Sequence, residues 1–143
     1  MQEKSALLSE TEALQINPVA LAFLGDAVYS LWVRERLVVS NAGSSADYQR
    51  SASLVESARG QNVLIERVLP ILTERETEIF KRGRNAKQAT KSKSACVAEY
   101  NRSTGFEAVL GILHLTGNDE RVDELLSMMD EVKAVSAPKS YKP

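Results

Sequence analysis

Residues 17–39 read NPVALAFLGDAVYSLWVRERLVV, and this stretch decides the fold class of the chain. Asn17 followed by Pro18 is typical of a helix start, because asparagine caps the first turn and proline suits the first helical position. The apolar residues that follow form a wide band at helical spacing: Val19, Leu21, Phe23, Leu24, Ala27, Val28, Leu31, Trp32 and Leu37. They predict one long buried helix that ends near Val39.

The rest of the 143-residue chain is also predicted to be helical, which makes the fold all-α, a helical bundle. Glycine and proline are scarce, with 7 and 4 residues, and alternating strand patterns between tight turns are absent. Thr73 and Glu76 match a capping box and start one helix. Other helices are expected at residues 46–58, 61–72 (with Gly60 between these two), 95–101, 106–115 and 118–132, and loops at 40–45 and 83–94.

The composition is that of an ordinary globular domain, with 43% hydrophobic and 26% charged residues. Cys96 is the only cysteine, so it can form no disulfide within the chain and is expected to be a buried, reduced thiol. No apolar run approaches the roughly 20 residues that a membrane-spanning helix needs. The polar start of the chain is unlike a secretory signal. We therefore expect a cytoplasmic protein without a membrane segment.

Charge is distributed unevenly along the chain. The net charge is only −1, yet the segment 81–93 contains six basic residues and no acidic one. The six are Lys81, Arg82, Arg84, Lys87, Lys91 and Lys93. Such a basic patch on an otherwise acidic body predicts a surface that faces a polyanion, although a solvated loop can have the same composition.

The inventory of reactive side chains excludes several kinds of site. His114 is the only histidine, and its apolar surroundings place it in the core or at the edge of the core. One histidine and one cysteine cannot build a zinc site of the usual kind. A glycine-rich phosphate loop is also absent from the sequence. The chemistry left to the chain is that of carboxylates with a hard cation.

Asp26 and Glu107 stand out among the acidic residues because apolar neighbours flank each of them. A carboxylate within an apolar helix is costly unless it is paired or bound to a metal. Two such groups on facing helices can hold Mg²⁺, which takes one or two carboxylates and keeps several waters. Simpler explanations stay open: Asp26 could cap a helix after Gly25, and Glu107 could complete a capping box with Thr104.

Five segments, taken in chain order, carry a family pattern. They are Phe23-Leu24-Gly25-Asp26-Ala27-Val28, Ser57-Ala58-Arg59-Gly60-Gln61, Lys81-Arg82-Gly83-Arg84-Asn85-Ala86-Lys87, Tyr100-x-x-Ser103-Thr104 and Phe106-Glu107-Ala108-Val109-Leu110-Gly111. Together they resemble the ribonuclease III family. The resemblance is closest to Mini-ribonuclease III, its compact bacterial group that lacks a separate double-stranded-RNA-binding domain. It covers residues 16–132 as the catalytic domain, which leaves 1–15 as an N-terminal extension and 133–143 as a tail expected to be disordered.

The resemblance implies an all-α homodimer that cuts double-stranded RNA with Mg²⁺ and leaves 5′-phosphate and 3′-hydroxyl ends. It implies that Asp26 and Glu107 are the catalytic, metal-binding carboxylates. It also places Phe23 at the dimer interface, although ordinary packing within one chain stays open for this residue. The RNA-binding residues that it implies are Arg82, Arg84, Asn85, Lys87, Lys91 and Lys93. The expected substrate is the precursor of large-subunit (23S) ribosomal RNA.

Three positions depart from the longer members of the family, which carry acids where this chain has Val19, Ala22 and Thr104. The compact group shares the threonine. Fewer acids leave fewer metal ligands, so the number of bound ions is open. The same departures keep a non-catalytic RNA-binding or ribosome-assembly module as an alternative. A metal-dependent nucleotide hydrolase is a third hypothesis, but the long basic segment suits a polymer better than a mononucleotide.

Overall fold

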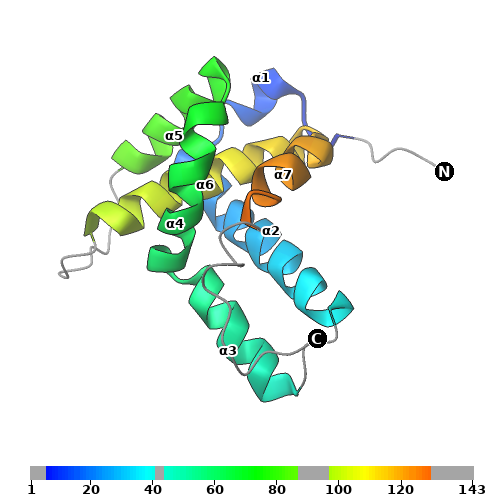
Figure 1. Cartoon of the computed structure of the whole chain (residues 1–143). Coiled ribbons are helices and arrows are strands. Elements are labelled where there is room, and N and C mark those ends of the chain that lie inside the picture. Colours follow the sequence, from blue (N-terminus) through cyan, green and yellow to red (C-terminus); the bar gives the residue numbers. More distant parts are fainter. Residues whose placement is uncertain (1–5, 41–43, 87–96, 130–143) are drawn as a thin grey trace.

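The computed structural model describes residues 6–40, 44–86 and 97–129. Every regular element within these ranges is a helix, so the predicted all-α fold is confirmed. The helices are α1 (Glu10–Ala13), α2 (Pro18–Val39), α3 (Ser45–Glu56), α4 (Ala58–Val68), the short 3-10 helix η1 (Leu69–Ile71), α5 (Glu74–Asn85), α6 (Val97–Leu115) and α7 (Asp119–Leu126). Figure 1 shows their arrangement.

Helix α2 has the bounds that the sequence predicted. The Asn17 side chain accepts a hydrogen bond of 2.7 Å from the backbone N–H of Val19, which caps the first turn. One face of α2 is buried and includes Leu21, Tyr29 and Leu37. The opposite face stays exposed, so α2 lies at the surface of the bundle rather than inside it.

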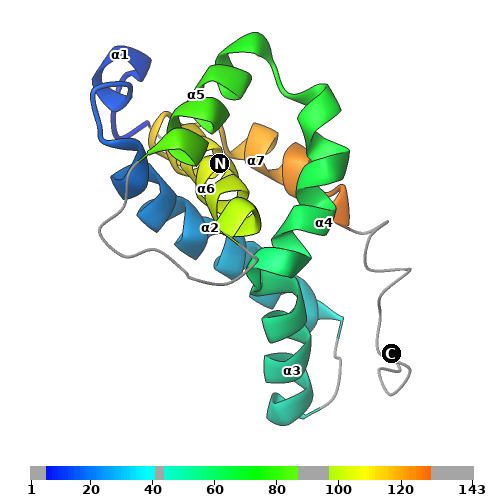
Figure 2. The same ribbon diagram turned by 90° about the vertical axis from the view of Figure 1, so that its left-hand side faces the viewer.

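Helix α6 lies at the centre of the bundle and packs against α1, α2, α4, α5 and α7 (Figure 1). Its residues from Ser103 to Ile112 are all buried except Glu107, which is half-buried. Helix α3 packs mainly on α2 and α4 and extends away from the body, as Figure 2 shows. The core therefore surrounds α6, and Glu107 is the one carboxylate that this buried stretch carries.

The break between α3 and α4 lies at Ser57, so the predicted boundary at Gly60 is wrong. Ser57 has extended backbone angles, and its hydroxyl accepts a hydrogen bond of 3.0 Å from the N–H of Gly60. A serine cap thus starts α4 three residues before the glycine. At the other end, α4 stops at Val68 because Pro70 cannot continue the helical hydrogen bonds.

Three further boundaries correct the sequence prediction. The expected loop at 83–94 starts later, because α5 continues to Asn85. The expected separate helices at 95–101 and 106–115 are one helix, α6. Ser103 and Gly105 have low helix propensity, but both are buried in the bundle, and tertiary packing outweighs propensity there. Helix α7 ends at Leu126, short of the predicted 132.

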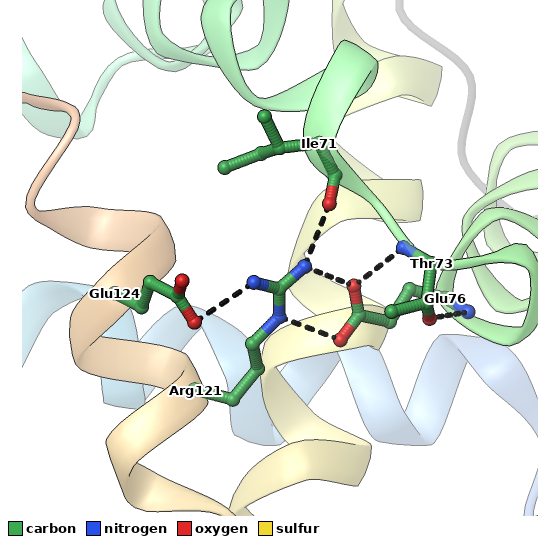
Figure 3. A network of polar contacts seen from close by, with 5 residues as sticks. All are labelled: Ile71, Thr73, Glu76, Arg121 and Glu124. Carbon is green, nitrogen blue, oxygen red and sulfur yellow. Dashed lines mark hydrogen bonds and ion pairs between the residues drawn. The ribbon is translucent and has the colours of Figure 1, made fainter.

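A buried ion pair fastens α7 to α5 (Figure 3). Arg121 donates hydrogen bonds of 2.8 and 2.9 Å to the two carboxylate oxygens of Glu76. The same guanidinium donates to the carbonyl of Ile71 at 2.8 Å and to Glu124 at 2.9 Å. Glu76 also completes the predicted capping box with Thr73, which is confirmed. One arginine therefore joins α7, η1 and α5.

The segment before α1 lies against the end of α6. The backbone N–H groups of Leu7 and Leu8 both donate to the carbonyl of Leu115, at 2.9 and 3.0 Å. Ala13 of α1 is fully buried. The tail at 133–143 lies outside the described residues. Among the helices that the structure describes, none combines the length and apolar character required to cross a membrane.

Candidate active site

A glycine lets α2 and α6 touch backbone to backbone, and this contact builds the site. A Cβ atom added at Gly25 would lie only 1.7 Å from the carbonyl oxygen of Glu107, a distance that no side chain can occupy. Only glycine allows the two helices to approach so closely. The next residue in α2 is Asp26, so the same contact brings Asp26 beside Glu107.

Asp26 and Glu107 line one pocket of about 370 Å³ between α2 and α6. The other lining residues come from α2, α3, α4 and α6, and they are Val19, Ala22, Phe23, Glu56, Gln61, Tyr100, Ser103 and Thr104. The sequence predicted that Asp26 and Glu107 lie together, and the geometry brings them together. Their roles in catalysis and metal binding stay predictions.

The two carboxylates differ in exposure. Glu107 is half-buried, whereas Asp26 is exposed to solvent, so the prediction of one long buried helix is wrong for this side of α2. The reason is that Asp26 lies on the outer side of α2, beyond the face that packs on α6. Asp26 therefore forms the open rim of the pocket, and Glu107 forms its inner wall.

Burial raises the pKa of Glu107 to about 8. A hydrogen bond of 3.0 Å from the side-chain amide of Gln61 to Oε2 of Glu107 acts in the opposite direction and lowers the pKa. The neighbouring carboxyl group of Asp26, within hydrogen-bonding reach, raises it again. Two carboxyl groups this close cannot both ionise cheaply without a cation. A bound cation would remove that conflict.

The pocket fits a hard divalent cation that keeps most of its waters. Among the described residues, neither Asp26 nor Glu107 forms an ion pair, and no group of three metal-binding side chains occurs. Glu56 also reaches the pocket, but its carboxylate already accepts a hydrogen bond from Ser30 and pairs with Arg34 at 3.6 Å. Two carboxylates are the number that Mg²⁺ commonly takes from a protein.

Thr104 lies in the interior of α6, which overturns the capping-box explanation for Glu107. Its hydroxyl donates a hydrogen bond of 3.1 Å to the carbonyl of Tyr100, one turn earlier. A capping box requires a helix start, and α6 starts at Val97. Asp26 likewise lies inside α2, so it caps no helix. Neither carboxylate has a capping role to explain its position.

The predicted RNA-binding residues fall into two groups. Arg82, Arg84 and Asn85 lie in the last turn of α5, where Arg82 and Asn85 are exposed and Arg84 is half-buried. Arg84 donates to the Asn85 side chain at 3.2 Å, and Arg82 to the carbonyl of Leu14 at 3.4 Å. The other three, Lys87, Lys91 and Lys93, lie outside the described residues.

The described basic end of α5 lies close to the pocket along α6. A Cβ at Gly83 would come within 3.1 Å of the carbonyl of Thr104, so the backbones of α5 and α6 touch there. Thr104 lines the pocket one turn before Glu107. Arg82 and Arg84 flank Gly83 in the sequence, so the basic end of α5 packs on the stretch of α6 that also carries Thr104.

Phe23 is 84% exposed, a rare state for a phenylalanine in a folded chain. It lines the mouth of the pocket. Ala27 and Leu31, four and eight residues further along α2, are exposed on the same side of the helix. Packing of Phe23 within one chain, the open alternative, is thereby contradicted.

His114, the only histidine of the chain, does not line the pocket. His114 is half-buried at the end of α6, and its Nδ1 lies 3.0 Å from the Asp119 carboxylate, in keeping with the predicted place at the edge of the core. Cys96 lies outside the described residues.

Sequence reasoning missed Gln61 and Glu56 as members of the site. Gln61 is only 2% exposed, and its amide contacts Glu107 directly. The segment Ser57-Ala58-Arg59-Gly60-Gln61 was noticed as a motif without a role. The sequence of this motif does not show that the Gln61 side chain is buried, or that it faces a residue 46 positions further along the chain.

Comparison with known proteins gives one consistent result. Residues 19–118 match the ribonuclease III domain family. The Mini-ribonuclease 3 of Streptococcus pneumoniae is 47% identical over 114 residues, covering 78% of this chain and 89% of the relative. The Mini-ribonuclease 3 of a Thermoanaerobacter species is 36% identical over 130 residues, covering 91% and 92% of the two chains.

A solved structure shares the fold. The crystal structure of protein FN1578 from Fusobacterium nucleatum superposes with a TM-score of 0.75, at 24% sequence identity, over 82% of this chain and 95% of the other. At this level of identity the likeness concerns the fold alone.

Proposed function

The chain belongs to the ribonuclease III family, within its Mini-ribonuclease III group, and on this premise we propose that it is an endoribonuclease that hydrolyses double-stranded RNA with Mg²⁺. The observation that carries the proposal is the meeting of Asp26 and Glu107 in one pocket, without a cationic partner among the described residues.

Asp26 and Glu107 would hold the cation from the two sides of the pocket. A bound Mg²⁺ supplies an activated water and offsets the negative charge that builds up on the phosphodiester. The exposed position of Asp26 leaves the outer side open to a phosphate, and the inner position of Glu107 keeps one carboxylate away from bulk water. Hydrolysis of this kind leaves 5′-phosphate and 3′-hydroxyl ends.

The positions of the family's missing acids support the same pocket. Val19, Ala22 and Thr104 stand where the longer relatives carry carboxylates, and all three line the pocket of Asp26 and Glu107. With neutral side chains at these three positions, Asp26 and Glu107 are the two carboxylates left to bind the cation. Fewer protein ligands suit a cation that completes its coordination with water and phosphate oxygens.

The basic residues suit an RNA duplex because proteins recognise A-form RNA mostly through its shape, phosphates and 2′-hydroxyl groups. Arg82, Arg84 and Asn85 at the end of α5 would bind phosphates, together with Lys87, Lys91 and Lys93 beyond it. Contacts to phosphates position a duplex without reading its sequence.

We place the protein in the cytoplasm, with a large-subunit ribosomal RNA precursor as substrate.

A homodimer is part of the proposal. Phe23, Ala27 and Leu31 form an exposed apolar stripe on α2, and a second copy of the chain would cover it. Sedimentation of the wild type beside Phe23→Ser tests this point. We expect a dimer for the wild type and a shift toward monomer for the variant, and a monomeric wild type would contradict it.

A non-catalytic RNA-binding module is the second candidate, favoured by the neutral residues at Val19, Ala22 and Thr104. It predicts duplex binding that needs no Mg²⁺ and leads to no cleavage. Hydrolysis of free nucleoside triphosphates without action on duplex RNA would instead indicate a nucleotide hydrolase.

The deciding experiment is a cleavage assay on a long RNA duplex, with Mg²⁺ and with EDTA. Wild type and Asp26→Asn are compared, with Glu35→Gln as control because Glu35 is an exposed acid on the same helix, away from the pocket. We expect Mg²⁺-dependent cleavage by the wild type and the control, and none by Asp26→Asn. Binding without cleavage by the wild type would favour the RNA-binding module.

A further inference from the structure

The segment Ser57-Ala58-Arg59-Gly60-Gln61 delivers one side chain to the pocket. Ser57 ends α3 and caps α4, so the chain turns sharply between the two helices. A Cβ at Gly60 would lie 2.1 Å from the carbonyl oxygen of Leu54, so only glycine allows the first turn of α4 to lie this close to α3. The next residue, Gln61, is thereby placed opposite Glu107 of α6.

The amide group of Gln61 ties three helices together at the site. Its Nε2 donates a hydrogen bond of 3.0 Å to Oε2 of Glu107 in α6 and a longer one of 3.4 Å to the carbonyl of Glu56 at the end of α3. The side chain itself belongs to α4 and is 2% exposed. A buried amide with two acceptors has little freedom to turn, so it restricts the orientation of the Glu107 carboxylate.

The oxygen atom of the same amide group has no hydrogen-bond donor among the described residues. Oε1 of Gln61 is buried and accepts no hydrogen bond from any described residue, while the residue lines the pocket. A buried acceptor without a donor costs roughly 1–3 kcal/mol. An unsatisfied buried acceptor therefore calls for an explanation. A water molecule bound to a cation between the two carboxylates would donate a hydrogen bond to Oε1.

An amide has a property here that a lysine or an arginine lacks. It donates a hydrogen bond to the Glu107 carboxylate, so it fixes the geometry, but it carries no charge and leaves the negative charge of the pair for a cation. A cationic side chain at the same place would neutralise Glu107 and compete with a metal ion. A glutamine beside a carboxylate is therefore compatible with a metal site, whereas an arginine in the same position forms a structural ion pair.

We propose that Gln61 is the positioning residue of the site: it holds the Glu107 carboxylate toward Asp26 in the orientation that binds the divalent cation. This inference rests on the proposed function, because it concerns the same cation. Residues that hydrogen-bond metal ligands typically change metal affinity 10–100-fold when they are replaced. Gln61 acts through Glu107 and does not itself touch the substrate.

The test measures Mn²⁺ affinity of the intact protein without RNA, by titration calorimetry or by the electron paramagnetic resonance signal of free Mn²⁺. Gln61→Met keeps the length of the side chain and removes the donor. We expect Mn²⁺ binding weaker by about 10- to 100-fold, with binding of an RNA duplex in EDTA unchanged. Wild-type Mn²⁺ affinity in Gln61→Met would overturn the inference.

Asn62→Ala is the matched control, because Asn62 is the neighbouring buried amide and donates to the Glu99 carbonyl at 2.8 Å and the Ser103 hydroxyl at 3.3 Å rather than to Asp26 or Glu107. We expect this variant to lower the melting temperature without changing Mn²⁺ affinity. An equal loss of affinity in Asn62→Ala would mean that Gln61 contributes only to stability.

A measurement on the unmodified chain keeps the inference testable if Gln61→Met does not fold. The side-chain NH₂ signal of Gln61 in a ¹H–¹⁵N spectrum should shift on titration with Mg²⁺, and it should stay in place in Asp26→Asn. If the backbone signals of Asp26 and Glu107 respond to Mg²⁺ while the Gln61 side chain does not, only the inference fails. If no signal responds and the wild type cleaves no RNA, the proposed function fails.

Discussion

Glu76 and Glu107 each follow a threonine by three positions, and Glu76 is buried and Glu107 half-buried, yet their surroundings are opposite. Thr73 and Glu76 form a true capping box at the start of α5. Thr104 and Glu107 show the same spacing in the middle of α6. The spacing alone therefore does not separate a helix cap from a site; the position in the helix does.

The partners of the two carboxylates differ as well. Glu76 is 6% exposed and receives two hydrogen bonds from the Arg121 guanidinium and one from the backbone of Thr73, as Figure 3 shows. Desolvation alone raises the pKa of Glu76, but these bonds and the charge of Arg121 outweigh it and hold the pKa below its usual value. Its charge is satisfied within the fold.

Glu107 has a neutral donor, Gln61, and an acidic neighbour, Asp26. Burial, together with the neighbouring Asp26, raises the pKa of Glu107 to about 8, although the hydrogen bond from Gln61 lowers it. A carboxylate that the fold itself neutralises stabilises structure, whereas one that the fold leaves without a cation is available for chemistry. The predictions below test this division.

The largest contrast is expected in cleavage. Glu107→Gln should reduce the rate on duplex RNA on the order of a thousandfold, because a lost metal contact removes several kcal/mol of transition-state stabilisation. Glu76→Gln should keep the wild-type rate per folded molecule. Single-turnover rates at saturating Mg²⁺ measure both. A large loss in Glu76→Gln at full folding would show that the division between the two carboxylates is wrong.

The next contrast concerns stability. Arg121→Leu leaves Glu76 buried without its partner and should lower the free energy of unfolding by roughly 3–5 kcal/mol. Urea denaturation measures the loss. The double variant Glu76→Leu with Arg121→Leu should recover part of it, because no buried charge remains. If Arg121→Leu lowers the free energy of unfolding by less than about 1 kcal/mol, the Glu76–Arg121 ion pair contributes no more than a solvent-exposed ion pair does.

The two carboxylates should also give opposite pH dependence of stability in EDTA. The pKa of Glu107 is raised, so its stabilising contribution is full below the unfolded value near 4.3 and is lost as the pH rises toward about 8. The pKa of Glu76 is lowered, so its contribution is present above roughly pH 4.3 and is lost as the pH falls further.

Urea denaturation across both pH windows checks these signs. Glu107→Gln should flatten the decline on the alkaline side, and Glu76→Gln should flatten the decline on the acid side. If the free energy of unfolding declines equally with rising pH in the wild type and in Glu107→Gln, the raised pKa of Glu107 is contradicted.

The smallest contrast concerns the two threonines. Thr73→Ala removes the cap of α5 and should cost about 1 kcal/mol. Thr104→Ala removes a hydroxyl that bonds back to the carbonyl of Tyr100 within the helix, and alanine is the better helix former, so the loss should be smaller. Thermal unfolding of both variants gives the comparison. A greater loss in Thr104→Ala would show that its packing matters more than the cap.

Local signals in the sequence were sufficient for much of the fold. Asn17 and Pro18 predicted the start of α2, and Thr73 predicted the start of α5, because capping depends on neighbours a few residues away. The boundary at Ser57 and the continuity of α6 through Gly105 depend on packing between helices. No local pattern reports that packing.

The candidate site divides in the same way. Asp26 and Glu107 were recognisable as acids in apolar segments and by family resemblance. Gln61 was not, because its role comes from a contact between residues 46 positions apart. The exposure of Asp26 was also missed, since apolar neighbours on a surface helix do not bury the residue between them.

The most direct test of the division between Glu76 and Glu107 is the change in melting temperature that Mg²⁺ causes in wild type, Glu107→Gln and Glu76→Gln. A ligand that binds only the folded state raises its stability. We expect Mg²⁺ to raise the melting temperature of the wild type and of Glu76→Gln by the same amount and to leave Glu107→Gln unchanged. A full shift in Glu107→Gln, or no shift in the wild type, would contradict the assignment of Glu107 to the cation.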